Sequence, residues 1–300
     1  MAQKKIVVVG SSNTDMTIKS GKLPIPGETV TGGIFYMGPG GKGANQAVAA
    51  KRLGGDVTFI CKVGSDLFGD NSIAGYEKEG IDTSHILRSN QASGTALILV
   101  DAAGENCIAV APGANSDLSE EDVDSIAPVL QQADFLILQL ETPVPSVLKA
   151  ARIAREAGAY VILNPAPACE LPCELFKYIS LLVPNQTEAS LLSGLQCHDE
   201  GCLLEAVARL RAKGVQDVVV TLGSKGSLVC HDGQVERIPA QIVQAVDTTA
   251  AGDTFCGAIA VGLSEGLSLP SAARFATKAS AITVQRMGAQ NSIPYRKDLI

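Results

Sequence analysis

The chain has 300 residues, of which 46% are hydrophobic and 18% are charged, so it is expected to be globular and not disordered. Its formal net charge of -7 argues against a nucleic-acid-binding protein, which would need a basic face. No stretch approaches the ~20 apolar residues of a membrane span, and the apolar run at residues 6–9 is too short for a signal peptide.

The first half of the chain predicts one strand and then a small antiparallel sheet. Residues 4–10 form a β-branched run that ends at a glycine, which is typical of a strand. Residues 95–101 and 106–110 flank an Ala-Ala-Gly-Glu turn and predict a hairpin, which residues 29–37 extend to a sheet. No Pro- or Ser-rich linker isolates this sheet. We therefore expect a lid, formed from about 14–37 and 94–111, inserted in a single domain over residues 1–300.

From about residue 134 predicted strands and helices alternate. Strands are expected at residues 135–140, 160–163, 179–183 and 217–221, and helices at 147–157 and 203–212. Such alternation is typical of an α/β fold, in which helices cover a mostly parallel sheet.

The strands of the predicted parallel sheet are followed by polar residues or by glycine. These residues are Asn13 and Asp15 after the first strand, and then Glu141, Asn164, Asn185 and Gly223. Ligands bind at the carboxyl ends of the strands in an open parallel sheet. Five such ends predict a single polar cleft.

Residues 247–255, with the sequence Asp-Thr-Thr-Ala-Ala-Gly-Asp-Thr-Phe, precede an apolar helix. A helix that begins at Gly252 directs free backbone N–H groups and its positive dipole end at one point, which favours anion binding. Asp253 in the first turn is then placed to take a proton from an attacking hydroxyl. For a Gly-Asp pair alone, an ordinary capped helix start is the alternative.

Two further glycine patterns bear on nucleotide binding. Residues 38–43 match GxGxxG, but they follow the predicted lid and lack an acidic residue ~20 positions later, so we discount a dinucleotide site. No GxxxxGK[ST] motif occurs, which excludes a P-loop enzyme. The longer string 40–47 opens an Ala-rich helix, and its Lys42 and Asn45 offer donors suited to sugar hydroxyls. A glycine turn into a packed helix is the alternative.

The eight cysteines include no CxxC pair. The spacing of Cys169 with Cys173, and of Cys197 with Cys202, is too loosely patterned for a convincing zinc site. The three histidines are isolated in the sequence, so no zincin motif or His-based triad is apparent. We therefore expect reduced, structurally passive thiols in a cytoplasmic protein.

Four strings together resemble the signatures of the ribokinase (PfkB-type) carbohydrate kinases. Residues 40–47 resemble the N-terminal signature and residues 247–255 the C-terminal one, about 200 residues apart and in the expected order. Residues 185–188 resemble the Asn-x-x-Glu motif near magnesium and phosphate, and residues 221–226 resemble the nucleotide-phosphate loop. The resemblance extends from Asn13 to Ser292. It implies a Rossmann-like α/β/α sandwich with a β-sheet lid, and a homodimer joined through the lids.

The same resemblance implies transfer of the γ-phosphate of ATP to the 5-hydroxyl of D-ribose. Asp253 is implied as the base, and the amides of Ala250, Ala251, Gly252 and Asp253 as the anion hole. The sugar would be held, together with Asp253, by Asn13, Asp15, Gly41, Lys42, Asn45 and Glu141. The nucleotide would be bound by Asn185, Thr221, Gly223, Ser224, Lys225, Gly226, Gly252 and Thr277.

Two metal sites are also implied by the resemblance. Asn185 and Glu188 would order Mg²⁺ and its waters. A monovalent cation, expected to be K⁺, would lie next to the anion hole. Its implied ligands, through carbonyls or side chains, are Asp247, Thr249, Thr283, Arg286, Gly288 and Ser292. Carbonyls and one carboxylate are the oxygen ligands that a hard cation prefers.

Three alternatives remain open at this point. A related kinase for deoxyribose or fructose would use the same phosphoryl-transfer residues. A nicotinamide-dependent oxidoreductase would use the loop at residues 38–43, and a comparison of ATP and NAD binding separates it from a kinase. A sugar-binding sensor that has lost catalysis is the third, against which the retention of Asp253 argues.

Overall fold

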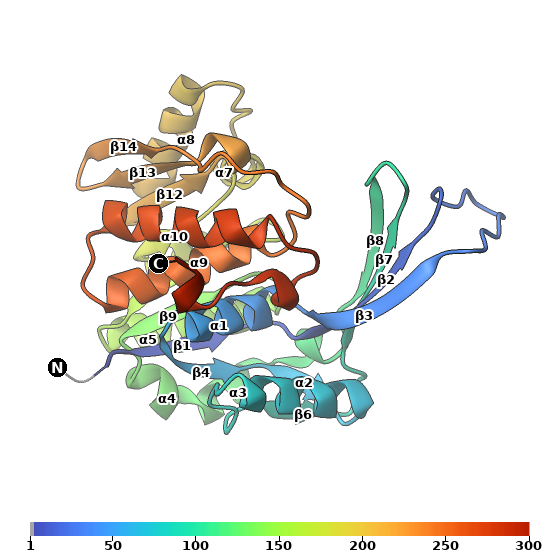
Figure 1. The fold of residues 1–300 in the computed structure, drawn as a ribbon. Coiled ribbons are helices and arrows are strands. Elements are labelled where there is room, and N and C mark those ends of the chain that lie inside the picture. Colours follow the sequence, from blue (N-terminus) through green and yellow to red (C-terminus); the bar gives the residue numbers. More distant parts are fainter. Residues whose placement is uncertain (1–2, 300) are drawn as a thin grey trace.

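The computed structural model describes residues 3–299 and contains a large sheet between helices, from which a smaller sheet projects at one end (Figure 1). The large sheet has eight strands, in the order β14-β13-β12-β11-β10-β9-β1-β4. The six strands from β12 to β4 are parallel, whereas β13 and β14 are antiparallel. The strands are β1 (Lys5–Val9), β4 (Asp56–Ile60), β9 (Phe135–Leu138), β10 (Tyr160–Leu163), β11 (Leu181–Leu182), β12 (Asp217–Thr221), β13 (Ser227–His231) and β14 (Gln234–Ile238).

The prediction of an α/β fold with a mostly parallel sheet is confirmed. The chain passes from β1 to β4 on one side and later to β9 on the other, so the direction of sheet growth reverses beside β1. Ligands of open α/β sheets bind at such a switch point, at the carboxyl ends of the strands. The first loop after β1 is therefore the place where a site is expected.

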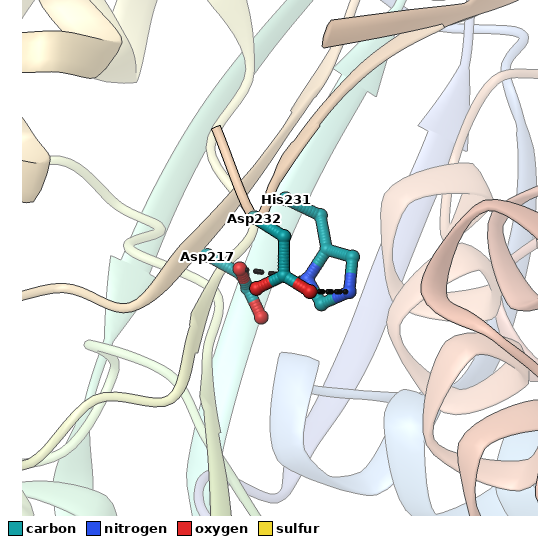
Figure 2. A group of neighbouring side chains, drawn as sticks. All are labelled: Asp217, His231 and Asp232. Atoms are coloured by element: carbon teal, nitrogen blue, oxygen red, sulfur yellow. Dashed lines mark hydrogen bonds and ion pairs between the residues drawn. The ribbon is translucent and has the colours of Figure 1, made fainter. Parts of the chain in front are cut away.

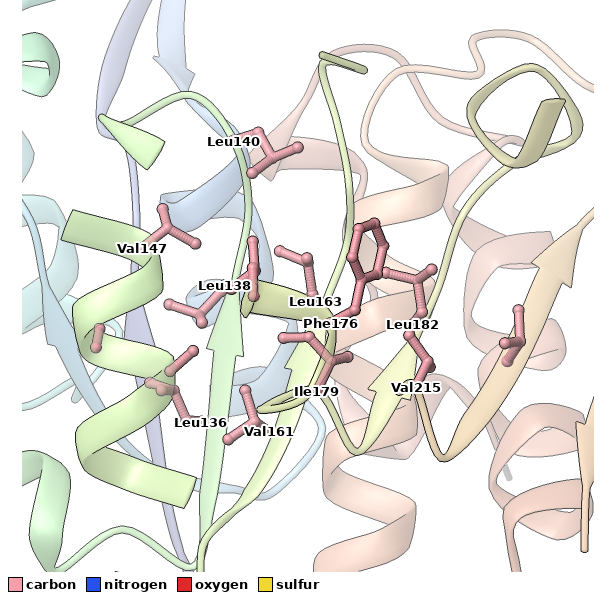
Figure 3. Close-up of a cluster of buried hydrophobic side chains, with 14 of the residues drawn as sticks. Leu136, Leu138, Leu140, Val147, Val161, Leu163, Phe176, Ile179, Leu182 and Val215 are labelled. Atoms are coloured by element: carbon pink, nitrogen blue, oxygen red, sulfur yellow. The ribbon is translucent and has the colours of Figure 1, made fainter. Parts of the chain in front are cut away.

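Alternate residues of the strands divide the core into two layers. Leu136 and Leu138 of β9 face one layer of helices, and Phe135 and Ile137 face the other. Figure 3 shows Leu136 and Leu138 in the same buried cluster as Val147 of the first layer. Because both faces of the parallel strands are covered, the strands are continuous apolar runs. The first layer contains α3 (Glu120–Ser125), α4 (Ala127–Gln131), α5 (Val144–Glu156), α6 (Cys173–Phe176), α7 (Gln186–Ser193) and α8 (Glu200–Ala212). The second contains α1 (Lys42–Arg52), α2 (Leu67–Lys78), α9 (Ala251–Ser264) and α10 (Leu269–Thr283).

The smaller sheet has four strands in the order β3-β2-β7-β8. They are β2 (Asn13–Lys19), β3 (Ile34–Gly40), β7 (Gly94–Val100) and β8 (Asn106–Ala111). The sheet is not wholly antiparallel as we expected, because β2 and β7 pair in parallel. Asn13 and Asp15, which were predicted to follow the first strand, lie in β2, and Asn13 is its first residue. The strand predicted at residues 29–37 is displaced toward the C-terminus and begins at Ile34.

Short elements complete the fold. A two-stranded sheet pairs β5 (Lys62–Gly64) with β6 (Leu87–Ser89). The 3-10 helices are η1 (Gly113–Asp117), η2 (Gly223–Lys225), η3 (Gln290–Ser292) and η4 (Arg296–Leu299). None of the helices within residues 3–299 has the length and apolar character needed to cross a membrane.

Candidate active site

Asp253 lies in the first turn of α9 and its side chain is buried, with 7% of its surface exposed. Two amides of α1 donate to its carboxylate. Asn45 Nδ2 is 2.9 Å from Oδ2, and Gln46 Nε2 is 3.0 Å from Oδ1. Residues that are more than 200 positions apart thus meet where α1 packs on α9.

This contact between α1 and α9 depends on Gly257. A Cβ atom at this position would lie 2.7 Å from the Ala49 Cβ atom and 2.8 Å from the Gln46 carbonyl oxygen. A glycine here lets the two helices approach closely enough for the amides of α1 to reach Asp253.

Gln46 also connects Asp253 to the middle of the large sheet. Its Nε2 donates to Asn164 Oδ1 at 3.1 Å, and its Oε1 accepts from Gln139 Nε2 at 2.7 Å. Asn164 in turn donates to the Val183 carbonyl at 3.0 Å. This buried network restricts the orientation of the carboxylate, because Gln46 is itself held by Asn164 and Gln139.

Glu141, which follows β9, is held beside the loop after β1. Its Oε2 accepts from Ser11 Oγ at 2.5 Å and from the Lys42 amide at 3.0 Å. The close approach requires Gly41, which has a φ of 90° and at which a Cβ atom would lie 2.8 Å from the Asn13 amide nitrogen. Residues 11–13, 41–42 and 141 therefore meet at the carboxyl ends of β1 and β9. Of these, Asn13 and Glu141 belong to the pattern of strand ends described above.

Asn13 is fixed by a residue that the sequence analysis did not identify. Asn115, which is buried in η1, donates through Nδ2 to Asn13 Oδ1 at 2.7 Å. Its Oδ1 accepts from the Ser12 amide at 2.8 Å. Asn115 thus joins η1 to the start of β2.

The carboxylates near Lys42 interact electrostatically. Burial, and then the charges of Glu141 and Asp253, raise the pKa of Asp15 to about 6. Burial would lower the pKa of Lys42, but the carboxylates of Asp253, Glu141 and Glu188 together raise it. Burial also raises the pKa of Asp253, although Lys42 and the two amides of α1 oppose this shift. Lys42 thus helps to keep Asp253 ionised, as a proton acceptor must be.

A pocket lies on the other side of the first turn of α9. It extends from Gly252 to the hairpin between β12 and β13, and to α10. Six residues predicted to bind nucleotide line this pocket: Thr221, Gly223, Ser224, Gly226, Gly252 and Thr277. Lys225 and Asn185 are not among its lining residues. The loop at residues 221–226 is therefore both a hairpin turn and one wall of a pocket.

The sequence analysis did not identify several other residues that line this pocket. Two further parts of the chain line it. They are the segment that leads to Asp247, through Ala240, Gln241, Val243 and Ala245, and the end of α10, through Ser280, Ala281 and Val284. This largely apolar wall is suited to a planar aromatic group. The segment has no glycine and no strand or helix pattern, so no sequence signal marked it.

Asn185 and Glu188 form a capping box at the start of α7. Glu188 N donates to Asn185 Oδ1, and Asn185 N donates to Glu188 Oε2, both at 2.8 Å. Asn185 Nδ2 donates to the second carboxylate oxygen, also at 2.8 Å. Burial raises the pKa of Glu188. Each oxygen accepts one hydrogen bond and retains a free lone pair, so the carboxylate can still accept a contact from Mg²⁺ or from one of its waters.

The six residues implied in monovalent cation binding divide into two groups. Asp247 Oδ1 accepts from Thr249 N at 2.9 Å and from Thr249 Oγ1 at 2.7 Å, and its Oδ2 accepts from Gly288 N at 2.9 Å. These hydrogen bonds lower the pKa of Asp247 in spite of its burial. The remaining three side chains bind elsewhere: Thr283 to Thr254 and the Ala279 carbonyl, Ser292 to the Ala289 carbonyl, and Arg286 to Asp298.

A second cluster of possible metal ligands lies far from this loop. Of the described residues, Asp217, His231 and Asp232 lie close enough together to share an ion (Figure 2). His231 Nδ1 is 2.9 Å from Asp217 and Nε2 is 3.2 Å from Asp232, so the carboxylates already occupy both ring nitrogens. Asp217 is the first residue of β12, and Thr221, which lines the pocket, is the last. The cluster and the pocket therefore lie at opposite ends of this strand.

Comparison with known proteins identifies the family. The pattern of the pfkB family of carbohydrate kinases matches residues 3–296. The chain belongs to this family. It is 45% identical over 299 residues to a ribokinase of Haemophilus influenzae, which covers 99% of this chain and 98% of that protein. It is 38% identical to a deoxyribokinase of Salmonella typhi over 96% of this chain and 95% of that protein.

The same family is found among solved structures. The ribokinase of Arabidopsis thaliana complexed with ribose and ATP superposes with a TM-score of 0.91 and is 34% identical, over 100% of this chain and 98% of that chain. The chain is thus a kinase, a phosphotransferase. The alternative of a nicotinamide-dependent oxidoreductase is not supported, since the loop at residues 38–43 joins β3 to α1 and does not line the pocket.

Proposed function

We propose that this kinase transfers the γ-phosphoryl group of ATP to the 5-hydroxyl of D-ribose. The observation that carries the proposal is the position of Asp253 between two sites. On one side are the polar groups around Asp15, Lys42 and Glu141, and on the other is the pocket that begins at Gly252. A sugar in the first site and ATP in the second would meet at the first turn of α9.

Sugar recognition is assigned to six residues in addition to Asp253. Carboxylates and amides supply both acceptors and donors, which matches a small molecule with a hydroxyl on nearly every carbon. Asn115 and Ser11 support them by fixing Asn13 and Glu141. The residues are Asn13, Asp15, Gly41, Lys42, Asn45 and Glu141.

The chemical step uses Asp253 as the base and the start of α9 as the anion hole. Asp253 accepts the proton of the attacking hydroxyl, and the first-turn amides stabilise the charge that develops on the transferred group. Ala251 N already donates to the Thr248 carbonyl at 3.2 Å. The amides of Gly252 and Asp253 are therefore the stronger candidates, and the space beside Gly252 is open.

The nucleotide would lie in the pocket, with its base against the apolar wall and its phosphates toward Gly252. We assign Asn185, Thr221, Gly223, Ser224, Lys225, Gly226, Gly252 and Thr277 to this site, and Glu188 to Mg²⁺ through water. Mg²⁺ bound to the phosphates would neutralise their charge. A Glu188→Gln variant with an unchanged Mg²⁺ requirement would contradict the second assignment.

The smaller sheet is proposed as a lid and as a dimer surface. By register, Ile18, Phe35, Met37 and Leu97 share one face, opposite to that of Asp15, and are 40%, 59%, 50% and 54% exposed. An exposed apolar face of this kind is typical of an interface. A second copy of the chain would cover it in a homodimer. Sedimentation tests this proposal, and a monomer at assay concentrations would contradict it.

The cytoplasm is the proposed location. Eight free cysteines are compatible with a reducing compartment. Fractionation of cells that produce the protein tests this assignment.

A sugar panel tests the proposed reaction. ADP release is measured with ribose, 2-deoxyribose and fructose in one buffer. Removal of the 2-hydroxyl leaves buried polar groups unpaired, at a cost of ~1–3 kcal/mol each. We expect kcat/KM for deoxyribose to be about one to two orders of magnitude lower than for ribose. If deoxyribose or fructose equals ribose, the phosphoryl-transfer assignment survives but the named substrate is wrong.

A further inference from the structure

Cys197 and Cys202 contact each other, although their sequence spacing suggested no pairing. Their Sγ atoms are 3.2 Å apart. An S–S bond is about 2.0 Å long, so a movement of roughly 1 Å would close it. Cys197 is buried, with 6% of its surface exposed, whereas Cys202 is partly exposed. Neither residue has a part in the proposed reaction.

The backbone on both sides of this contact is anchored. Gly194 ends α7 in the left-handed region, with a φ of 73°, which turns the chain back toward α8. Cys202 lies in the first turn of α8, where its amide donates to Asp199 Oδ1 at 2.8 Å. Cys197 Sγ donates to the Cys202 carbonyl at 3.3 Å. The two thiols are therefore held face to face across one short loop.

We propose that Cys197 and Cys202 form a redox-active dithiol, which a low-molecular-weight disulfide such as glutathione disulfide converts to an intramolecular disulfide. The more exposed Cys202 sulfur attacks one sulfur of the small disulfide and releases the other half as a thiol. The Cys197 sulfur then attacks Cys202 in the mixed disulfide and releases the second half. Two electrons pass from the cysteines to the small disulfide, and the two thiol protons end on the released thiols.

The surroundings of Cys202 control the rate of this exchange. The hydrogen bond with Cys197, then burial and the nearby carboxylates of Asp199 and Glu205, raise the pKa of Cys202 to about 11. The thiolate is the nucleophile, so exchange should be slow at neutral pH and should accelerate as the pH rises.

The dithiol is connected to the first turn of α7. The Cys197 carbonyl accepts from Gln186 Nε2 at 2.9 Å, and the Cys197 amide donates to Ser190 Oγ at 3.2 Å. Gln186 follows Asn185, whose capping box holds Glu188. Closure of the disulfide would displace Cys197 and hence this turn, so we expect a change of at least about twofold in the KM for Mg²⁺–ATP. This kinetic readout rests on the proposed function, whereas detection of the disulfide does not.

The test uses the reduced full-length protein and glutathione disulfide. After treatment, alkylation and trypsin digestion, residues 178–209 form a fragment that contains these two cysteines and no others. We expect this fragment to carry no alkyl group. Its mass should be lower by two hydrogens than that calculated for the same fragment with two free thiols. Cys197→Ser should trap glutathione on Cys202, whereas Cys202→Ser should leave the buried Cys197 unmodified. Cys107→Ser, at an exposed cysteine, is the matched control and should retain the disulfide.

Alkylation of both cysteines under conditions that attach glutathione to Cys107 would overturn the proposal. Reaction of Cys197 in the Cys202→Ser variant would overturn the order of attack. A disulfide-containing protein with an unchanged KM for Mg²⁺–ATP would overturn the connection to α7. A failure of the proposed function is distinguishable, because it would appear as lack of ribose phosphorylation in both redox states.

Discussion

Gln46 donates a hydrogen bond to Asp253 across the contact between α1 and α9, with 3.0 Å between Nε2 and Oδ1. The same Nε2 binds Asn164 at the end of β10, and Gln139 beside β9 holds the other end of the amide. Asp253 is therefore oriented by two central strands as well as by its own helix. A general base needs such a fixed position, because proton transfer requires hydrogen-bond distance to the attacking hydroxyl.

Asp253→Asn removes the proposed base and keeps the shape of the side chain. A positioned base contributes roughly 10²–10⁴-fold in rate, so we expect kcat to fall by at least that lower value. Burial penalises the ionised carboxylate, and the variant should therefore remain folded. Steady-state assays with ribose and ATP, with circular dichroism as the control for folding, check this. Near-normal turnover would show that Asp253 is not the base.

Gln46→Met removes one donor to the Asp253 carboxylate and approximately keeps the side-chain volume. Hydrogen bonds from Gln46 and Asn45 oppose the raised pKa of Asp253, so their loss favours the protonated, inactive form. We expect the acid limb of the kcat profile to move to higher pH by about one unit. The matched control is Gln132→Met, at an exposed position. A lower kcat with an unmoved acid limb would assign Gln46 to packing alone.

Asp15→Asn should stabilise the free protein at neutral pH. The pKa of Asp15 is raised to about 6 in the folded state, mainly by burial and then by Glu141 and Asp253. Ionisation is therefore disfavoured by folding, and wild type loses stability as the pH rises through about 6. We expect the free energy of unfolding of the variant to exceed that of wild type by about 2 kcal/mol at about pH 8. Below about pH 4 the two free energies of unfolding should be equal.

Urea unfolding of both proteins at several pH values measures the difference. A constant difference across the pH range would contradict the titration of Asp15. The variant should also lose affinity for ribose, because an amide cannot replace the second acceptor oxygen. Greater stability with weaker binding is the expected result for a residue selected for ligand recognition.

The strands of the large sheet and the two strings at residues 40–47 and 247–255 were predictable because local signals mark them. The runs at residues 160–163 and 217–221 are β-branched and end at turn residues, and their bounds match β10 and β12. The string at residues 247–255 marked the start of α9 for a physical reason. The first amides of any helix are free, and small residues such as Gly252 leave them open to a ligand. By contrast, β2 has the sequence Asn-Thr-Asp-Met-Thr-Ile-Lys, in which the apolar alternation is limited to Met16 and Ile18, so its polar first three residues gave no strand signal.

The residues that hold the site together were not predictable, because their roles arise from packing. Gln46 reaches Asp253 only where Gly257 lets two helices approach, and Asn115 reaches Asn13 from another element. The sole local signal for Gln46 was its place next to Asn45 in the glycine-rich string at residues 40–47. No local signal marked Asn115. The proposed cation ligands Thr283 and Ser292 show the opposite case. Their hydroxyls donate to carbonyls of the protein itself, so their own carbonyls are the groups that would bind a cation.

Activity should depend on K⁺, because the loop around Asp247 leads directly to the anion hole. Asp247 joins Thr249 to Gly288, and Ala250, with a φ of 60°, follows as the N-cap of α9. A cation held by the carboxylate and nearby carbonyls would fix this strained turn. Misplacement of a reacting group by about 1 Å can cost about 10²-fold, so we expect a rate at least about tenfold higher in K⁺ than in Na⁺.

Assays in the two salts at equal ionic strength measure this effect. Asp247→Asn should abolish the difference, whereas Asp232→Asn, at an exposed acid remote from the pocket, should preserve it. Thermal unfolding provides a second readout, because an ion that binds only the folded protein raises its stability. Equal rates and equal unfolding temperatures in K⁺ and Na⁺ would mean that Asp247 organises the loop through Thr249 and Gly288 without a cation.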